Sequence, residues 1–123
     1  MAHLFLCFNP YEPTPNRAPL ISDWLELCRH GQQECVNKMV AMVADLHLYG
    51  IGSRYLKWFA GGVGELKSRT RVGGARVYLF RVGEDEFALT RAECKDESEA
   101  DEQLVDWTFE VAALFRQGIE VFL

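Results

Sequence analysis

Hydrophobic positions in the first half of the chain repeat with the spacing of helices, after one short apolar run. The opening segment "HLFLCF" predicts a buried strand, and the prolines of residues 10–19 indicate a stiff surface loop. Apolar residues then recur every three or four positions from Leu20 to about Arg29, and again from Gln32 to Tyr49, which predicts two helices. Gly31 separates them, and Gly50 is well placed to end the second. The second helix is expected to bury a stripe of Cys35, Met39, Met42, Val43 and Leu46, widened by Val36 and Val40.

The second half of the chain changes to alternation of polar and apolar positions. Residues 51–62 predict a loop that ends in paired glycines. Three strands follow, joined by short glycine-containing turns, at Val63–Thr70, Ala75–Val82 and Phe87–Cys94. This order predicts an antiparallel β-meander.

The C-terminal segment predicts one more helix. Ser98 can cap its start, and Asp101 three residues later resembles a capping box. Its buried stripe is expected to contain Leu104, Trp107, Val111, Leu114 and Phe115. The last residues, "IEVFL", predict a short final strand.

The middle strand of the meander offers two faces. Val77 and Leu79 are the better core residues, so Arg76 and Tyr78 are expected on the exposed face. On the preceding strand Leu66 is expected to point inward. Lys67 and Arg69 then join Arg76 outside, which predicts a cluster of positive charge on one face of the sheet.

Length and composition fit one α+β domain, residues 1–123. In it an N-terminal strand and two helices pack on the antiparallel meander, and a C-terminal helix follows. The chain has 123 residues, of which 49% are hydrophobic, enough for a packed core. No apolar run reaches the roughly 18 residues of a membrane span, so no membrane partner is predicted. The opening residues lack a basic leader and a cleavage site, which favours a cytoplasmic location.

The four cysteines form no CxxC pair. Cys28 and Cys35 are spaced to share a helical face, where a zinc or redox site could recruit His30 or His47. The alternative is that Cys7, Cys28, Cys35 and Cys94 are reduced, half-buried small hydrophobes, and this is the preferred interpretation. Neither a metal nor a cofactor is predicted.

Charge is strongly segregated along a chain whose net charge is −5. From Arg54 to Arg81 there are seven basic residues against one acid, Glu65. From Glu84 to Glu110 there are eleven acids against Arg91 and Lys95. This pattern predicts a phosphate-facing surface on the hairpin, the alternative being a simply solvated ribbon.

The basic half carries a set of short motifs in a familiar order. They are Lys57, Gly61-Gly62, Glu65-Leu66-Lys67, Arg76-Val77-Tyr78 and Lys95, within "RYLKWFAGGVGELKSR", "GGARVYLF" and "FALTRAECK". In order and spacing they resemble the RelE/ParE toxin superfamily, in particular its phage-derived HigB-like branch. The similarity covers roughly residues 20–116.

The resemblance implies a RelE-like fold and a toxin of a type II toxin–antitoxin system. Its partners would be a helix-turn-helix antitoxin, the ribosome and mRNA, which it would cut by activating a ribose 2′-hydroxyl against the adjacent phosphate. By register Arg76 would hold that phosphate, with Lys67 beside it and Lys95 as a third charge. Tyr78 is the further catalytic candidate, and the remaining RNA-binding candidates are Arg54, Lys57, Arg69 and Arg71.

Three departures from the family pattern imply an attenuated enzyme. Lys67 replaces an arginine, Asp96 replaces the second lysine of a Lys-Lys pair, and the following helix lacks the usual aromatic residue or histidine. A ParE-like inhibitor of DNA gyrase, and a non-catalytic phage or accessory protein-binding module, are therefore kept as alternatives. For Arg76 the purely structural alternative is a cross-strand ion pair with Glu65.

Overall fold

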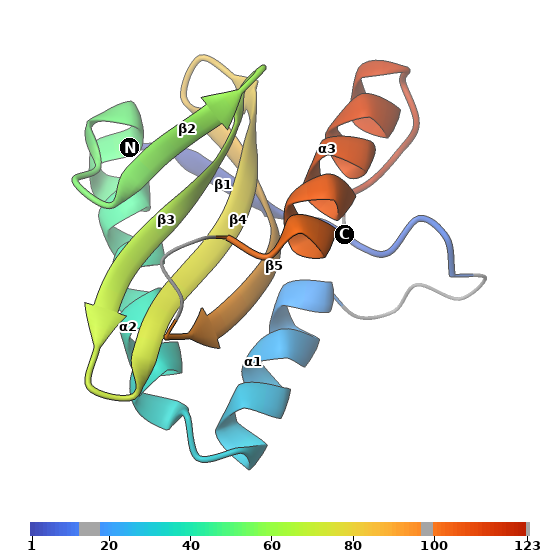
Figure 1. Ribbon diagram of the computed structural model, residues 1–123. Helices are drawn as coiled ribbons and strands as arrows, with labels where there is room; N and C mark the ends of the chain where they lie inside the picture. The colour runs from blue at the N-terminus through green and yellow to red at the C-terminus, as the bar shows by residue number, and fades with distance from the viewer. Residues whose placement is uncertain (13–17, 97–99, 123) are drawn as a thin grey trace.

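The computed structural model describes residues 1–12, 18–96 and 100–122 and shows an α+β fold, with helices on both faces of one mixed sheet (Figure 1). The elements are β1 (His3–Leu6), α1 (Pro19–Arg29), α2 (Gln33–Tyr49), a 3₁₀ turn η1 (Gly50–Gly52), β2 (Leu56–Ala60), β3 (Val63–Thr70), β4 (Gly73–Gly83), β5 (Glu86–Lys95) and α3 (Glu102–Arg116). Both predicted N-terminal helices and all three strands of the predicted meander are confirmed.

The sheet has five strands in the order β1-β5-β4-β3-β2. Strands β2 to β5 pair antiparallel, whereas β1 runs parallel to β5 with His3 opposite Glu86. The antiparallel meander therefore forms the larger part of the sheet but not all of it. Because β1 occupies an edge, its side chains are half-buried or exposed rather than fully buried.

Strand β2 corrects the prediction of a loop over residues 51–62. Its sequence, LKWFA, lacks clean alternation because an edge strand needs to bury only part of one face. Lys57 and Trp58 are exposed, while Phe59 is half-buried. The paired glycines follow β2 and make its turn into β3, where Gly61 and Gly62 have φ values of 56° and 76°.

Helices α1 and α2 end at the glycines that the sequence marks. Gly31 has a φ of 76° after the last turn of α1, and Gly50 has a φ of 56° at the end of α2. The buried stripe of α2 is largely as expected, but Val40 is 51% exposed because it lies on the flank that faces solvent. No helix within residues 1–12, 18–96 and 100–122 is both long and apolar enough to cross a membrane.

Helix α3 begins later than predicted. Its N-cap is Asp101, whose carboxylate accepts hydrogen bonds from the backbone N–H groups of Gln103 (2.8 Å) and Leu104 (3.2 Å). The predicted cap, Ser98, lies outside the described residues. After α3, Phe122 makes an isolated antiparallel bridge with Cys7, where the sequence predicts a short strand.

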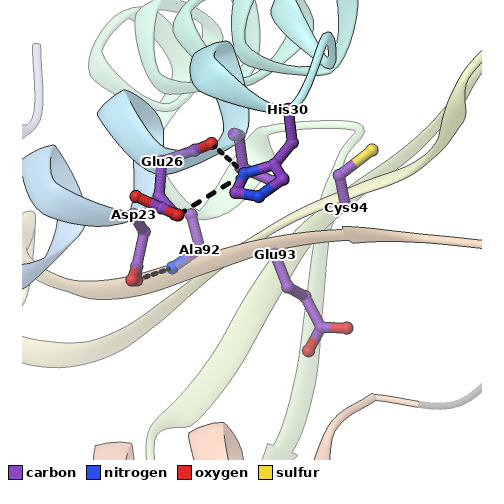
Figure 2. Close-up of a pocket in the computed structure, with 7 residues that line it drawn as sticks. Asp23, Glu26, His30, Ala92, Glu93 and Cys94 are labelled. Atoms are coloured by element: carbon purple, nitrogen blue, oxygen red, sulfur yellow. Dashed lines mark hydrogen bonds and ion pairs between the residues drawn. The ribbon is translucent and has the colours of Figure 1, made fainter.

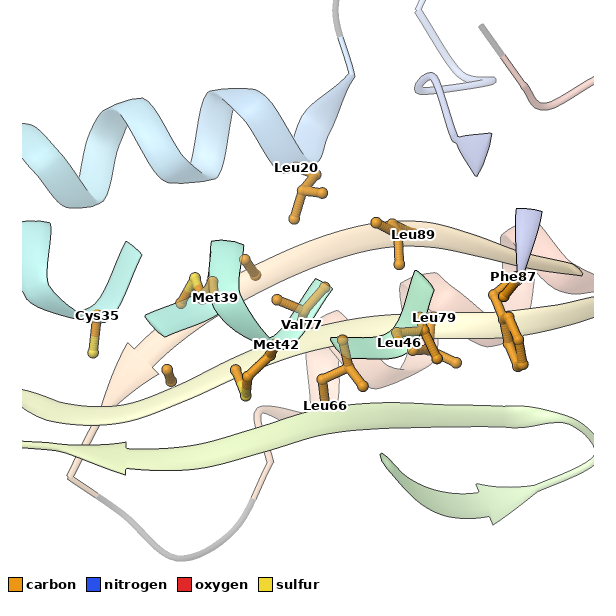
Figure 3. Packing of buried hydrophobic residues seen from close by; sticks show 13 residues of the cluster. Leu20, Cys35, Met39, Met42, Leu46, Leu66, Val77, Leu79, Phe87 and Leu89 are labelled. Carbon is orange, nitrogen blue, oxygen red and sulfur yellow. The ribbon is translucent and has the colours of Figure 1, made fainter. Parts of the chain in front are cut away.

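The sheet is covered on both faces, and this decides the environment of its charged residues. On one face α1 and α2 pack on Leu66, Val77 and Leu79 (Figure 3). On the other face α3 packs on Val63 and Phe80, together with the C-terminal segment. Neither face of the central strand β4 is therefore open along its whole length.

The structure contains a disulfide between Cys35 at the start of α2 and Cys94 at the end of β5. The prediction that these two cysteines are reduced is wrong; the sequence could not show that residues 59 positions apart meet. Cys7 and Cys28 are unbonded thiols. Burial raises the pKa of the Cys7 thiol to about 12, which keeps it protonated and unreactive.

Reduction of this disulfide is expected to lower the free energy of unfolding by about 2–4 kcal/mol, because it releases a loop of about 60 residues in the unfolded chain. Urea unfolding of the oxidised protein and of Cys94→Ser measures the difference. Cys28→Ser is the matched control, since it removes a thiol without a crosslink, and it should unfold at nearly the same urea concentration as the parent. Equal stability of Cys94→Ser and the parent would contradict the expectation.

Candidate functional site

Four basic side chains line one small pocket, near the end of β3, the start of β4 and the end of β5. Lys67 and Arg69 come from β3, Arg76 from β4 and Lys95 from the end of β5. The pocket has a volume of about 70 Å³ and is completed by Ser68, Gly74 and Asp96. We call this set of seven residues the cationic pocket.

Strand register brings these residues together. Lys67 lies opposite Arg76, and Gly74 lies opposite Lys95, so three neighbouring strands contribute to one place. Alternation directs Lys67 and Arg69 to the same face of β3. The expected convergence of Lys67, Arg69, Arg76 and Lys95 is thus present in the structure.

The surroundings of Arg76 differ from the expectation of an exposed face. Its side chain is only 2% exposed and lies against Glu65, which is 1% exposed. Nη1 of Arg76 donates to both carboxylate oxygens of Glu65, at 3.2 and 3.1 Å. The ion pair that the sequence suggested therefore exists, but it is buried, because the face opposite α1 and α2 is also covered.

Tyr78 is buried as well and belongs to a second acidic centre. Its hydroxyl donates to Oε2 of Glu93 at 2.5 Å, and the same oxygen accepts from the backbone N–H of Asp101 at 3.1 Å. Nζ of Lys95 lies 3.4 Å from the other oxygen, Oε1 of Glu93. Burial and the bond to Glu93 raise the pKa of Tyr78, so its phenol stays protonated. Tyr78 can donate a hydrogen bond but cannot serve as a base near neutral pH.

The charge balance of the site limits its chemistry. Within the described part of the chain, these four cations face three carboxylates, those of Glu65, Glu93 and Asp96. The local excess of positive charge is small, and the two carboxylates of Glu65 and Glu93 compete with any incoming phosphate. Such a site can hold an anionic oxygen through its lysines and Arg69. Arg76 can join only by sharing its guanidinium with Glu65.

The other predicted RNA-binding residues separate into two groups. Arg69 also lines a groove of about 450 Å³ between α2 and β3, formed with Glu34, Asn37, Lys38, Ala41, Thr70 and Arg71. Nε of Arg71 donates to Glu34 at 3.0 Å within this groove. Arg54 lies elsewhere: it stacks over Tyr55 and lines a pocket with Asp45, Tyr49 and Gly52. Lys57 is exposed on β2, opposite Glu65 in the β2–β3 register, and does not line the cationic pocket.

Several residues of the site were not found from the sequence. Lys38 and Glu34 come from α2, and their approach to the β3–β4 hairpin depends on tertiary packing. Glu65, by contrast, is recognised in the sequence as a possible ion-pair partner of Arg76, because alternation places it on the same face as Lys67, next to the strand that carries Arg76. The role of Glu93 depends on the start of α3, which supplies the N–H of Asp101.

A further pocket of about 220 Å³ lies between α1 and β5 and is rich in acids (Figure 2). Its carboxylates have structural partners: Asp23 accepts from Arg91 at 2.8 and 3.1 Å and from the N–H of Ala92 at 2.9 Å. Nδ1 of His30 lies 2.9 Å from the backbone carbonyl oxygen of Glu26. Across the described part of the chain, no group of three His, Cys, Asp or Glu side chains is arranged to hold a metal ion.

Comparison with known proteins does not assign the site. The chain matches no protein-family model, and a search of curated proteins finds no significant match.

Removing one partner of the buried ion pair should be costly. Arg76→Ala is expected to lower the free energy of unfolding by about 3–5 kcal/mol, because it leaves the Glu65 carboxylate buried without its guanidinium. The double variant Glu65→Leu/Arg76→Met should recover most of that loss, since two apolar side chains of similar volume avoid the desolvation cost. Urea denaturation of the three proteins checks this. A double variant that is less stable than Arg76→Ala would show that the pair is a net source of stability.

Alkaline pH should destabilise the protein through Tyr78. Its pKa is raised in the folded state, so its contribution is fully present below the usual tyrosine value of about 10 and is lost as pH rises further. The free energy of unfolding should therefore fall between about pH 9 and 11, and fall less steeply in Tyr78→Phe. Urea midpoints across this range measure both slopes. Tyr49→Phe, which removes an exposed phenol, is the control, and parallel slopes for Tyr78→Phe and the parent would contradict the assignment.

Proposed function

We propose that the protein is a RelE/HigB-like toxin of a type II toxin–antitoxin system that acts as an attenuated, ribosome-dependent mRNA endonuclease. The observation that carries the proposal is the convergence of Lys67, Arg69, Arg76 and Lys95 on the cationic pocket. These are residues for which the resemblance of the sequence implies contact with RNA. An antitoxin would be the neutralising partner.

The chemistry expected of such a pocket is stabilisation of a phosphorane. When a ribose 2′-hydroxyl attacks the adjacent phosphate, negative charge develops on the non-bridging oxygens and on the leaving 5′-oxygen. Lys67 and Arg69 can supply cations to the non-bridging oxygens, and the Lys95 ammonium can stabilise or protonate the leaving oxygen. None of these steps requires the Tyr78 phenol to lose its proton.

The same geometry supports attenuation. Glu65 holds the guanidinium of Arg76, and the Glu93 carboxylate lies beside Lys95. A phosphate that enters the pocket must compete with both carboxylates. The proton of the 2′-hydroxyl would pass to solvent water, since the Tyr78 phenol stays protonated. We therefore expect phosphate binding to be retained better than cleavage.

A protein-binding module is the second candidate, favoured by one observation. The solvent side of α2 and η1 exposes Val40, Leu48, Tyr49 and Ile51, which are all more than half exposed. Large apolar side chains grouped along one helix are a feature of surfaces that bind other proteins. In this case the charged residues of the cationic pocket would stabilise the sheet and would not bind RNA.

Growth and cleavage assays test the leading proposal. Expression of the chain should slow growth, and primer extension in a translating extract should show cuts in mRNA that depend on translation. Lys67→Ala should abolish both effects, whereas Arg29→Ala, a charge-matched change on the exposed end of α1, should change neither. Binding of single-stranded RNA should weaken with added salt, and Lys67→Ala should reduce the slope of log affinity against log salt by about one.

The remaining outcomes separate the alternatives. Absence of cuts together with inhibition of gyrase supercoiling would favour the ParE-like activity. Absence of growth arrest, of cuts and of gyrase inhibition would contradict the toxin proposal and leave the protein-binding module.

A further inference from the structure

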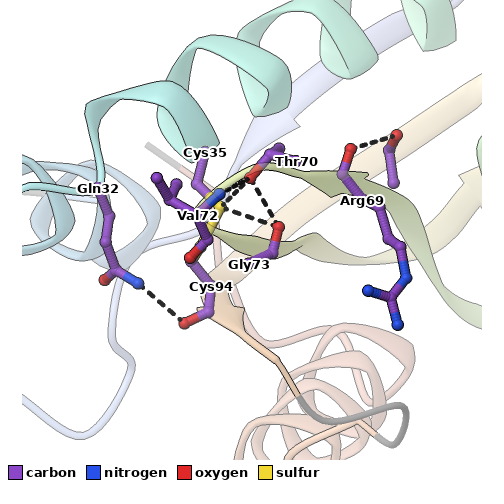
Figure 4. Close-up of a disulfide and its surroundings, with 8 residues drawn as sticks. Gln32, Cys35, Arg69, Thr70, Val72, Gly73 and Cys94 are labelled. Atoms are coloured by element: carbon purple, nitrogen blue, oxygen red, sulfur yellow. Dashed lines mark hydrogen bonds between the residues drawn. A yellow bond between two sulfur atoms is a disulfide. The ribbon is translucent and has the colours of Figure 1, made fainter.

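The Cys35–Cys94 disulfide joins two residues that are each next in sequence to a residue lining one of the cavities with basic residues. It lies beside the β3–β4 turn at Val72 and Gly73 (Figure 4). Cys35 follows Glu34, which lines the groove between α2 and β3. Cys94 precedes Lys95, which lines the cationic pocket. One covalent bond therefore joins α2, which forms a wall of the groove, to the strand end that carries a cation of the pocket.

The disulfide also fixes the β3–β4 hairpin. Sγ of Cys35 lies 3.3 Å from Oγ1 of Thr70, whose hydroxyl donates to the carbonyl oxygen of Gly73 at 2.7 Å. A side chain at Gly73, where φ is 141°, would place its Cβ 3.0 Å from Sγ of Cys94. The turn and the sulfur atoms are thus in close contact, and only glycine leaves room for them.

The two sulfur atoms differ in accessibility. Cys35 is fully buried, whereas Cys94 is half-buried and lines the pocket between α1 and β5. In Figure 2 the side chains of Cys94 and His30 lie on the helical side of β5, and Glu93 points to the opposite side. A thiol entering this pocket would reach Cys94 first.

We propose that the Cys35–Cys94 disulfide is a reversible redox switch that controls how rigidly the residues of the cationic pocket are held. The thiolate of a dithiol reductant attacks Sγ of Cys94, the disulfide bond breaks, and Cys35 leaves as a thiolate that then takes a proton. The second thiol of the reductant displaces Cys94 as a thiol, so that the reductant becomes a disulfide and both cysteines are reduced. Cys35 is in the first turn of α2, where the helix dipole favours the departing negative charge.

Reduction would remove the covalent restraint at the residue next to Lys95 and at the contact with the β3–β4 turn. The strand end and the turn would then fluctuate more, and the cations of the pocket would no longer be held in one arrangement. Exchange with an oxidised dithiol reagent, which is itself reduced to the dithiol, would re-form the Cys35–Cys94 bond and restore the arrangement. The coupling to RNA binding rests on the function proposed above, whereas the change in local order does not.

Hydrogen exchange of the oxidised and dithiothreitol-reduced proteins tests the switch. Reduction should accelerate exchange at residues 73–76 and 93–95 by about tenfold more than at residues 87–89, whose amides lie in the core and follow only the loss of global stability. Cys94→Ser should reproduce the reduced pattern, and Cys28→Ser, with the disulfide intact, should keep the oxidised one. If Cys94→Ser does not fold, reduction of the parent protein alone supplies the comparison.

Three results would overturn the switch: unchanged exchange at residues 73–76 and 93–95, equal acceleration at residues 87–89, or a disulfide that resists dithiothreitol in the folded protein. In parallel, fluorescence anisotropy with a single-stranded RNA oligonucleotide should show about tenfold weaker binding by the reduced protein. Equal binding by both forms would overturn the coupling to the pocket. No binding by either form, with the exchange difference present, would contradict the proposed function and leave the redox response standing.

Discussion

The buried pair of Glu65 and Arg76 is the electrostatic constraint that the rest of the site has to accommodate. The two opposite charges are both buried on neighbouring strands of the sheet. Burying either charge without the other would carry a large desolvation cost. Their pairing allows α3 to cover this face of the sheet, as α1 and α2 cover the other. The pair also ties β3 to β4 through side chains as well as through the backbone ladder.

The same pair shapes what the site can do. An arginine that faced solvent could close on a phosphate with its whole guanidinium, but this one already has a carboxylate in contact. Glu93 has a similar effect, since it accepts the Tyr78 hydroxyl and lies near Lys95. The molecule therefore combines convergent cations with internal counterions, an arrangement better suited to holding an anion than to driving its cleavage.

Local features of the chain could be predicted, whereas features that depend on distant partners could not. Alternation located β3 with its exact ends at Val63 and Thr70, and helical spacing with terminal glycines located α1 and α2. Strand β2 was missed because an edge strand can pair through its backbone without an alternating pattern. The burial of Arg76 was missed because alternation separates two faces but does not tell whether a later helix covers the second. The disulfide was missed because its cysteines meet only after the sheet and α2 have packed.

The pairing of β1 with β5 has a consequence for the order of events during synthesis. Strand β1 is synthesised long before its partner, which begins only at Glu86. Until β5 is made, the backbone N–H and C=O groups of β1 lack the partners that they have in the folded sheet, and a contact this distant in the chain is slow to close. The β1–β5 pair can therefore close only after β5 has been made, and until then β1 is open to non-native contacts.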